Sequence, residues 1–279
     1  MPEGHTLRRL ADEIGQAFGG RAVRVSSPTG RFAADAATLD GQRLVGADSA
    51  GKHLFVEFPA DRFLHIHLGL IGKFDVLPGP APAPVGVVRL RLEANGPAPA
   101  YADLRGATQC DLVTLARRDT VLAGLGPDPL RKEADPDLAW RRISRSHRPI
   151  GDLLLDQGVL AGVGNVYRAE VLFRGRLHPL RPGRTLRAGQ WRAIWDDLVE
   201  LMAEGVRTGR IDTVRPEHTP DAMGRPPRKD DHGGEVYVYR RTGQPCLVCR
   251  TAVRTAVLKE RNIFWCSRCQ RPYRPRALQ

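Results

Sequence analysis

The chain of 279 residues has no apolar run that approaches the roughly 18–20 residues of a membrane-spanning helix. It also lacks the pattern of a secretory signal peptide. No P-loop, H-E-x-x-H motif, serine–histidine–aspartate arrangement or internal repeat is present. These absences predict a protein without a membrane partner, and they give no support to P-loop nucleotide hydrolysis, zinc-protease chemistry or triad-based acyl transfer.

Negative charge is scarce in the second half of the chain. Residues 1–130 contain 14 basic and 14 acidic side chains, so the net charge of +12 belongs entirely to residues 131–279. From residue 235 to residue 279 there are 10 basic residues and 2 acidic ones. A basic block of this kind favours a polyanionic partner, with nucleic acid as the leading candidate.

Cysteine is also rare, but four of the five cysteines are clustered. Cys246 and Cys249 form one C-x-x-C pair, and Cys266 and Cys269 form a second pair sixteen residues later. This arrangement is typical of a four-thiolate zinc ribbon, whose closed ligand set leaves no coordination position for a substrate. We therefore predict one structural Zn²⁺ and a reducing cytoplasmic location, and we expect the fifth cysteine, Cys110, to be a small core residue.

The predicted ribbon also presents a basic surface. It carries four arginines and a lysine, with Phe264 and Trp265 between them: Arg250, Arg254, Lys259, Arg261 and Arg268. A basic hairpin of this composition fits a phosphate backbone or a groove of nucleic acid, and a solvated basic face is the alternative.

The first 130 residues combine one helix with several strands. Apolar residues from Leu7 to Phe18 recur at helical spacing, Thr6 can cap the helix, and a Gly-Gly pair ends it. Alternating residues then predict strands over 21–25, 54–58, 63–68 and 87–92. Because these strands follow one another with no helix between them, an antiparallel β-sandwich is expected.

The second half is mainly helical. Apolar residues lie at helical spacing over 150–155, 166–173 and 190–207. The polar stretch 216–234 predicts a mobile loop, and alternating residues at 235–240 predict a strand that leads into the cysteine cluster. The expected fold is therefore α+β and multidomain, with domains at 1–130, 131–234 and 235–279.

The start of the chain carries chemistry if Met1 is removed. Pro2 would then be a secondary amine, and a free α-amino group titrates near pH 7.7–8.0, so a useful fraction is neutral at pH 7. Attack on an aldehyde-like carbon would give a Schiff base, and Glu3 would be within reach to move protons. An unstructured terminus is the alternative, although the helix predicted directly after it would hold this segment against a packed surface.

Four further residues are candidates for function. Asn165 follows a glycine-rich break and is a good N-cap for a helix whose start attracts phosphate, although a simple interhelical turn is equally consistent. Lys52 follows a glycine at a strand entrance, where a surface lysine is the default. His65 and His67 share a strand face, which favours a polar sheet face or a DNA contact over a metal site because no third ligand is evident.

Taken in order, these segments resemble the formamidopyrimidine-DNA glycosylase / endonuclease VIII family of base-excision repair enzymes. They are most similar to the endonuclease VIII branch that has a Pro-Glu-Gly-His-Thr start. The resemblance implies an N-terminal β-sandwich with flanking helices, a helix–two-turn–helix DNA-binding domain and a C-terminal zinc ribbon. The matching segments span nearly the whole chain: 1–4, 51–52, 153–157, 161–170 and 261–270.

The resemblance also implies roles for single residues. Pro2 corresponds to the Schiff-base nucleophile, and Glu3 to the acid that assists base loss and ring opening. Lys52 corresponds to the lysine of proton transfer in β-elimination. Arg261 corresponds to the ribbon arginine of δ-elimination and phosphate contact, and Asn165 to the asparagine that binds the lesion phosphate.

Several positions depart from the family pattern. Thr6 stands where a glutamate is frequent, which removes a salt bridge to Arg261. Leu70 is the expected wedge in the gap-filling loop, but Gly69 replaces a polar DNA contact. Gly124 likewise replaces an arginine, and Arg105 is expected to take part of the opposite-strand role.

We therefore predict a bifunctional DNA glycosylase and abasic-site lyase of base-excision repair. It would remove oxidised bases, pyrimidines in preference to purines, through a proline Schiff base and would nick the strand by β,δ-elimination. The expected partner is damaged DNA, single- or double-stranded, bound by a monomer in the cytoplasm at the nucleoid. The rival prediction is a non-catalytic zinc-ribbon nucleic-acid-binding protein on the same scaffold.

Overall fold

The computed structural model describes residues 2–229 and 234–274. The chain divides into two compact units, Met1–Gly124 and Leu125–Gln279. Each unit has a hydrophobic cluster of its own. Within the described ranges, no helix combines the length and the apolar character that a membrane crossing requires.

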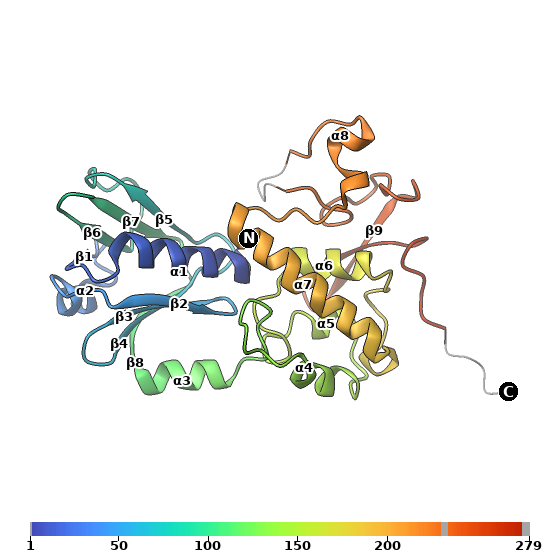
Figure 1. Ribbon diagram of the computed structural model, residues 1–279, viewed down its shortest axis with the longest axis horizontal. Coiled ribbons are helices and arrows are strands. Elements are labelled where there is room, and N and C mark those ends of the chain that lie inside the picture. Colours follow the sequence, from blue (N-terminus) through green and yellow to red (C-terminus); the bar gives the residue numbers. More distant parts are fainter. Residues whose placement is uncertain (1, 230–233, 275–279) are drawn as a thin grey trace. The chain divides into compact units, whose positions relative to one another are not determined.

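The first unit contains two four-stranded antiparallel sheets (Figure 1). One sheet has the order β1 (Arg24–Ser26), β6 (Leu90–Ala94), β7 (Ala100–Arg105) and β5 (Lys73–Pro78). The other has the order β2 (Gly46–Ala50), β3 (His53–Phe58), β4 (Arg62–His67) and β8 (Gln109–Thr114). The predicted β-sandwich is thus confirmed, and buried Cys110 in β8 is a core residue as expected.

Two predicted strands differ in their bounds from those observed. The strand predicted at 21–25 begins only at Arg24, because residues 21–23 bond instead to residues 42–44, outside both sheets. The strand predicted at 87–92 begins at Leu90. Sequence alternation shows that a backbone is extended, but it does not show which segment will pair with it.

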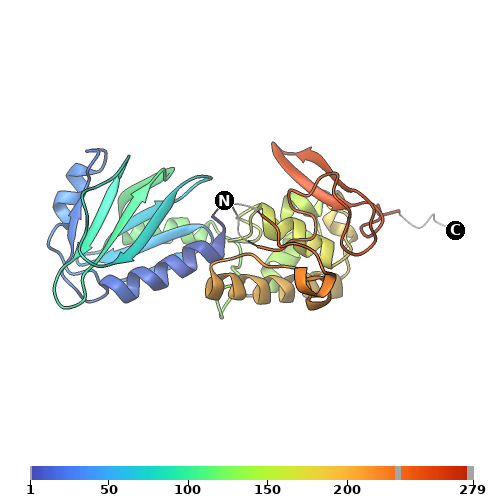
Figure 2. The ribbon, with the colours of Figure 1, turned by 90° about the horizontal axis from the view of Figure 1, so that it is seen from above.

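Helix α1 (Gly4–Phe18) contacts strands of both sheets (Figures 1 and 2). Its apolar stripe enters the core through Leu7, Leu10, Ile14 and Phe18. The helix starts three residues earlier than predicted, and Glu3 rather than Thr6 is its N-cap. Thr6 lies in the first turn, where its N–H donates to the Glu3 carbonyl oxygen at 2.9 Å and its Oγ1 accepts from the Glu3 N–H at 3.4 Å.

The sequence pattern gives no signal for two other helices of this unit, α2 (Ala33–Leu39) and α3 (Leu115–Ala123). Helix α3 buries none of its residues, so it has no apolar stripe that periodicity could reveal. Thr114 caps it by accepting from the Arg117 N–H at 3.4 Å.

The second unit joins helices and a hairpin in one core. The predicted helices correspond to α5 (Ile150–Leu153), α6 (Asn165–Arg174) and α7 (Ala188–Thr208), and α4 (Pro136–Ile143) lies before them. Strands β9 (Val253–Leu258) and β10 (Arg261–Cys266) form the hairpin, red in Figure 2. Leu172 of α6 and Leu198 of α7 belong to the same cluster as Phe264 and Cys266, so the ribbon is packed on the helices.

The strand predicted at 235–240 is wrong. The Glu170 carboxylate, fully buried, accepts from the N–H groups of Tyr237 (2.6 Å), Val238 (2.9 Å) and Tyr239 (2.9 Å). A strand would direct consecutive N–H groups to opposite sides, whereas here one carboxylate gathers three of them. Residues 235–240, despite their alternating sequence, therefore form a buried loop whose N–H groups bind the Glu170 carboxylate.

The stretch 216–234, predicted as a mobile loop, begins with short helical turns. These are η2 (Pro216–His218) and α8 (Pro220–Met223); a similar turn, η1 (Gly183–Thr185), precedes α7. Arg225 then pairs with Glu235 at 2.7 Å. Residues 230–233 lie outside the described ranges, so mobility of the stretch stays a prediction.

Candidate functional site

The first residues of the chain approach Lys52 because of the way α1 lies on β2. The Arg8 guanidinium pairs with the Asp48 carboxylate at 3.2 Å, and beyond the other end of the helix the Gly20 N–H donates to the Leu44 carbonyl oxygen at 2.8 Å. These contacts make α1 antiparallel to β2 (Figure 1). The start of α1 therefore lies beside the end of β2, which leads directly into Lys52.

Glu3 is fully enclosed at the start of α1. Its side chain has 0% exposure, and its backbone is extended, with φ −123° and ψ −179°. The partial positive charge of a helix start favours a carboxylate at this position. Pro2 precedes it and is half-buried, whereas Met1, whose removal the Schiff-base chemistry requires, lies outside the described residues.

Lys52 is held at the tip of a two-residue hairpin turn. Ala50 and His53 form the pair that closes the turn between β2 and β3. Gly51 has φ +57°, the left-handed value that a two-residue hairpin of this kind requires at its first position. The turn thus fixes the half-buried Lys52 at the end of the sheet that the N-terminal segment approaches.

The loop after β4 presents two apolar side chains at this same end. Leu70 is 53% exposed and Ile71 is 80% exposed. Gly69 has φ +71°, and a Cβ there would lie 2.4 Å from Thr108 Cγ2. A larger side chain at position 69 would therefore strain the backbone and require Thr108 to move.

Arg105 is engaged by acids within its own sheet. Its Nη2 donates to Asp103 Oδ2 at 2.8 Å, and Asp75 lies 3.8 Å away. Burial alone would raise the pKa of Asp103, but hydrogen bonds and charges from Arg91 and Arg105 lower it below its usual value. A contact of Arg105 with the opposite DNA strand would have to share this guanidinium with Asp103.

Three histidines, His53, His65 and His67, cluster close to Lys52. His53 Nδ1 is 2.9 Å from His65 Nε2, and the His53 and His67 ring centroids are 5.2 Å apart. Burial is the main reason that the pKa of both His53 and His65 is lowered to about 4, although the charge of Asp111 opposes the shift at His65, so both are neutral at pH 7. His65 is only 1% exposed and bonds to neighbouring polar side chains, which favours a polar sheet face over a DNA contact, the two alternatives predicted for this residue.

In the second unit, Arg168 links the two residues with predicted phosphate contacts. Asn165 is the first residue of α6 and Gly164 is its N-cap, so the capping role predicted for Asn165 is wrong. Asn165 Oδ1 instead accepts from Arg168 Nη2, which also donates to the Asn262 carbonyl oxygen at 3.0 Å. Since Oδ1 is occupied, the amide group of Asn165 is left to donate to a ligand.

Arg261 is the first residue of β10 and directly precedes Asn262. It pairs with Leu258 across the two-residue turn of the hairpin, and its side chain is exposed. The structure therefore places Asn165 and Arg261 on neighbouring elements, joined through the buried Arg168.

The four clustered cysteines form a site that fits zinc. The Sγ atoms of Cys246, Cys249, Cys266 and Cys269 all lie within 4.8 Å of one another. Tetrahedral Zn–S bonds of about 2.3 Å would place them about 3.8 Å apart, and the Cys246–Cys269 pair is at 3.9 Å. Four thiolates close the coordination shell, so the ion would supply structure rather than chemistry.

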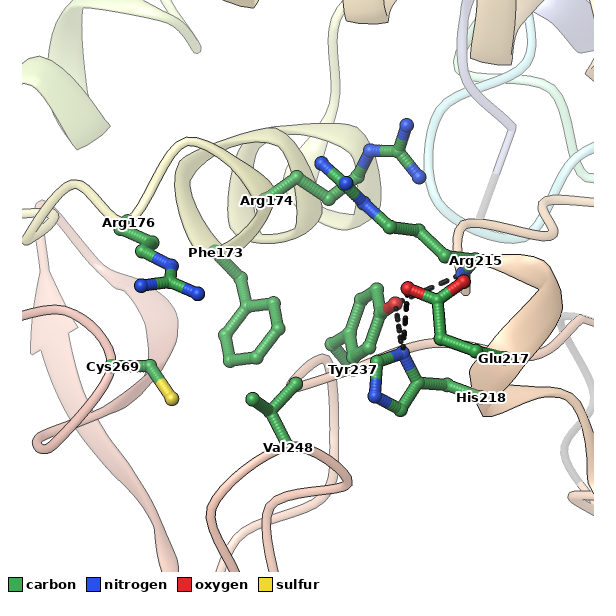
Figure 3. A pocket seen from close by; sticks show the side chains of 9 residues that line it. All are labelled: Phe173, Arg174, Arg176, Arg215, Glu217, His218, Tyr237, Val248 and Cys269. Carbon is green, nitrogen blue, oxygen red and sulfur yellow. Dashed lines mark hydrogen bonds and ion pairs between the residues drawn. The ribbon is translucent and has the colours of Figure 1, made fainter. Parts of the chain in front are cut away.

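A cavity of about 200 Å³ lies elsewhere in the second unit, between the end of α6 and the cysteines (Figure 3). Phe173 and Tyr237 stack there with ring centroids 4.5 Å apart. The Tyr237 hydroxyl accepts from the Arg215 N–H at 2.9 Å and contacts His218 Nδ1 at 3.0 Å. Of the predicted site residues only Cys269, a zinc ligand, lines this cavity.

Sequence reasoning gave no role to Arg168 or Glu170, although both lie within a segment that carries the family resemblance. Arg168 is 1% exposed and Glu170 is 0% exposed. Two charged residues on the otherwise apolar helix 166–173 were the available signal, because a charge in such a position must find a partner.

Three family models match the chain in order. Residues 1–110 match the formamidopyrimidine-DNA glycosylase N-terminal domain, and residues 125–216 match the H2TH domain of the same family. Residues 243–272 match the zinc finger found in FPG and IleRS. These matches agree with the sandwich, the helices and the cysteine-containing hairpin.

Curated relatives match over nearly the full length. The protein called Endonuclease 8 1 of Mycobacterium tuberculosis is 49% identical, over 97% of this chain and 100% of the relative. The Formamidopyrimidine-DNA glycosylase of Parasynechococcus marenigrum is 32% identical, over 97% of this chain and 99% of the relative.

Solved structures share the fold. MutM (Fpg) from Thermus thermophilus has a TM-score of 0.71 at 29% identity, covering 96% of this chain and 98% of the other. Lactococcus lactis Fpg in complex with DNA containing an abasic site has a TM-score of 0.76 at 21% identity, covering 97% of this chain and 100% of the other. The predicted multidomain fold is thereby confirmed.

Proposed function

Because the chain belongs to the formamidopyrimidine-DNA glycosylase / endonuclease VIII family, we propose that it is a bifunctional DNA glycosylase and abasic-site lyase of base-excision repair. One observation carries the proposal. The antiparallel packing of α1 on β2 brings the start of the chain, with Pro2 and Glu3, to the turn that holds Lys52. An amine, an acid and a lysine are then grouped at one end of the sandwich.

The proposed reaction begins with Pro2 as a free secondary amine. Its nitrogen attacks C1′ of the damaged nucleotide, the C1′–base bond breaks, and the base leaves with a proton. Glu3 assists base loss and sugar ring opening as an acid. The resulting iminium acidifies C2′, Lys52 takes part in removing that proton, and the bond from C3′ to its phosphate oxygen breaks.

Arg261 and Asn165 are assigned to the phosphates. The Asn165 amide group donates to the lesion phosphate, and the Arg261 guanidinium binds phosphate during the second elimination, at C5′. The excess positive charge of residues 131–279 neutralises further phosphates. With roughly 6–10 such contacts, affinity would fall about 10³–10⁵-fold between 50 and 200 mM salt.

The proposed substrates are oxidised bases, with pyrimidines preferred over purines. The 49% identity to a protein called Endonuclease 8 1 supports the endonuclease VIII branch. Extruding a base leaves a gap in the stack, and exposed Leu70 is the side chain proposed to fill it. The chain would act as a monomer on single- or double-stranded DNA, in the cytoplasm at the nucleoid.

Borohydride reduction tests the mechanism. An oligonucleotide with one abasic site is incubated with the protein, and the covalent complex is measured after reduction. The wild-type chain, with Met1 removed, is expected to be trapped, and Pro2→Gly is expected to lose most of the trapped product. Pro97→Gly, which alters an exposed loop proline, is the matched control.

The two rival functions give different results in this assay. A non-catalytic nucleic-acid-binding protein would bind the abasic oligonucleotide without being trapped. Trapping that survives Pro2→Gly at equal yield would contradict a specific role for the secondary amine of proline, because the glycine variant still carries a primary α-amine. A panel of duplexes carrying oxidised pyrimidines or purines then tests the substrate class, and faster release of purines would contradict the proposed preference.

A further inference from the structure

The turn between β9 and β10 has a strained backbone. Its two residues, Lys259 and Glu260, have φ values of 46° and 59°. Two-residue turns in this left-handed region favour Asn and Gly, because other side chains bring Cβ too close to the backbone. A strained conformation of this kind persists only where its surroundings hold it.

An ion pair holds this turn from one side. Lys259 Nζ lies 2.9 Å from Asp152 Oδ2, and the Asp152 side chain, in α5, is only 8% exposed. The same carboxylate oxygen accepts from Arg148 Nε at 2.6 Å, and Arg148 also pairs with Asp156 at 2.8 Å. The Asp152 carboxylate that pairs with Lys259 is therefore buried and is also held by Arg148, whereas the Lys259 side chain is 64% exposed.

The strand beyond the turn is held from the other side. Arg168 of α6 donates to the Asn262 carbonyl oxygen at 3.0 Å. Arg261 lies between these two supports, two residues after Lys259 and one before Asn262. Its position therefore depends on both α5 and α6, although its own side chain projects from the hairpin.

We propose that Lys259 is a positioning residue for Arg261. Its ion pair with Asp152 holds the strained turn on α5 and so fixes the direction in which the Arg261 guanidinium meets the phosphate during the second elimination. This inference rests on the proposed function of Arg261. Lys259 acts here through the turn, and the competing role is a direct phosphate contact by its own ammonium group.

Product analysis separates these roles. A duplex with a preformed abasic site is incubated with each variant, and the ratio of β,δ- to β-elimination products is measured beside the borohydride-trapped yield. Lys259→Met is expected to lower the ratio roughly fivefold, the factor that corresponds to the upper range for partly exposed ion pairs. Trapping depends on Pro2 and should be unchanged, and Lys259→Arg should restore the ratio.

Asp152→Asn discriminates between positioning and direct contact. It leaves the charge of Lys259 in place but removes its partner, so a positioning role predicts the same fall in the ratio. The double variant should fall no further than Asp152→Asn alone, because loss of the Asp152 carboxylate already removes the pair with Lys259 together with the one to Arg148. Lys132→Met, which removes an exposed positive charge in the same unit, is the control for net charge.

Several results would overturn the inference. These are a normal ratio in Lys259→Met, a fall shared by Lys132→Met, a normal ratio in Asp152→Asn, or a wild-type chain that is trapped but gives only the β product. An equal loss of trapping and of the ratio would also overturn it, because that pattern indicates general damage to the fold. A wild-type chain that is never trapped would instead contradict the proposed function.

Discussion

Arg168 donates to the main-chain oxygen of Asn262 at 3.0 Å, and this hydrogen bond ties the first turn of α6 to the start of β10. The same guanidinium nitrogen donates to Asn165 Oδ1. One buried arginine thus sets the orientation of the Asn165 amide and the place of the strand that carries Arg261. Both predicted phosphate ligands of the second unit depend on it.

Asn165→Asp is expected to weaken DNA binding without weakening the fold. The aspartate oxygen still accepts from Arg168, but a second carboxylate oxygen replaces the amide N–H donor and repels phosphate. Affinity for an abasic-site duplex should fall by about tenfold or more, roughly 1.4 kcal/mol, while the unfolding temperature stays equal or rises. Binding isotherms and thermal unfolding check this.

Asn95→Asp makes the same change of charge at an exposed position of the first unit and serves as the control. Equal weakening of DNA binding in both variants would assign the effect to net charge alone.

Zinc removal is expected to destabilise the second unit as a whole. Cys246 and Cys266 share a hydrophobic cluster with residues of α6 and α7, so loss of the ribbon exposes a helical core. Zinc binding in small domains is worth about 10–16 kcal/mol, and we expect the unfolding temperature of this unit to fall by more than about 10 °C on chelation.

Tryptophan fluorescence isolates this effect, because all four tryptophans, 140, 191, 195 and 265, lie in the second unit. Cys110→Ser, in the first unit, should leave the zinc-dependent shift unchanged. An unfolding temperature that is insensitive to the chelator would show that the packed core alone maintains the ribbon.

The first unit is expected to lose stability as the pH falls from about 6.5 toward 4. Burial lowers the pKa of His53 and His65 from 6.5 to about 4, so in this window the unfolded chain binds protons that the folded chain does not. Stability from neutral, buried histidines is therefore complete above pH 6.5 and declines below it, by up to about 1.4 kcal/mol per pH unit for each histidine.

Urea unfolding followed by far-ultraviolet circular dichroism at pH 7.5, 6 and 5 measures this slope. His65→Gln should flatten it relative to the wild type, whereas His147→Gln, in the second unit, should not. If the free energy of unfolding falls with pH equally steeply in the wild type and in His65→Gln, then the carboxylates of the protein, rather than this histidine, dominate the pH dependence of stability.

Leu70→Ala is expected to slow base removal from duplex DNA roughly tenfold, because the gap left by an extruded base would be incompletely filled. Leu70 is 53% exposed, so the free energy of unfolding should change by less than about 0.5 kcal/mol. Single-stranded substrates have no opposing stack to support and should react at the wild-type rate.

Leu77→Ala, at another exposed leucine, is the matched control. Rates on duplex and single-stranded lesions, measured under single-turnover conditions, give the comparison. An equal loss on both substrates would remove Leu70 from the gap-filling role.

The sequence predicts features that depend on residues close together in the chain. The spacing of Cys246, Cys249, Cys266 and Cys269 is enough to indicate the metal site, because each C-x-x-C pair presents two thiolates locally. Helical spacing likewise predicts α1 and α7, each of which buries an apolar stripe, and α6, which is buried on all sides. Helix α3 escapes prediction because it has no such stripe.

Features that depend on distant partners are harder to predict. Residues 235–240 alternate like a strand, yet their N–H groups converge on Glu170, more than sixty residues earlier in the chain. His65 alternates like a surface residue, yet it is buried against His53. For His65 the pattern correctly predicts a strand but not the partner, whereas for residues 235–240 it predicts a strand that does not form.

By itself, the sequence determined which chemical groups this protein possesses: an amine and an acid at its start, a turn lysine, four thiolates and a basic second half. Only the tertiary structure decided which of them meet. The antiparallel packing of α1 on β2 brings Glu3 toward Lys52, and buried Arg168 joins α6 to β10. The physical reason is that a buried charge must be satisfied by whatever partner the packed core brings to it, and that partner is not encoded by sequence spacing.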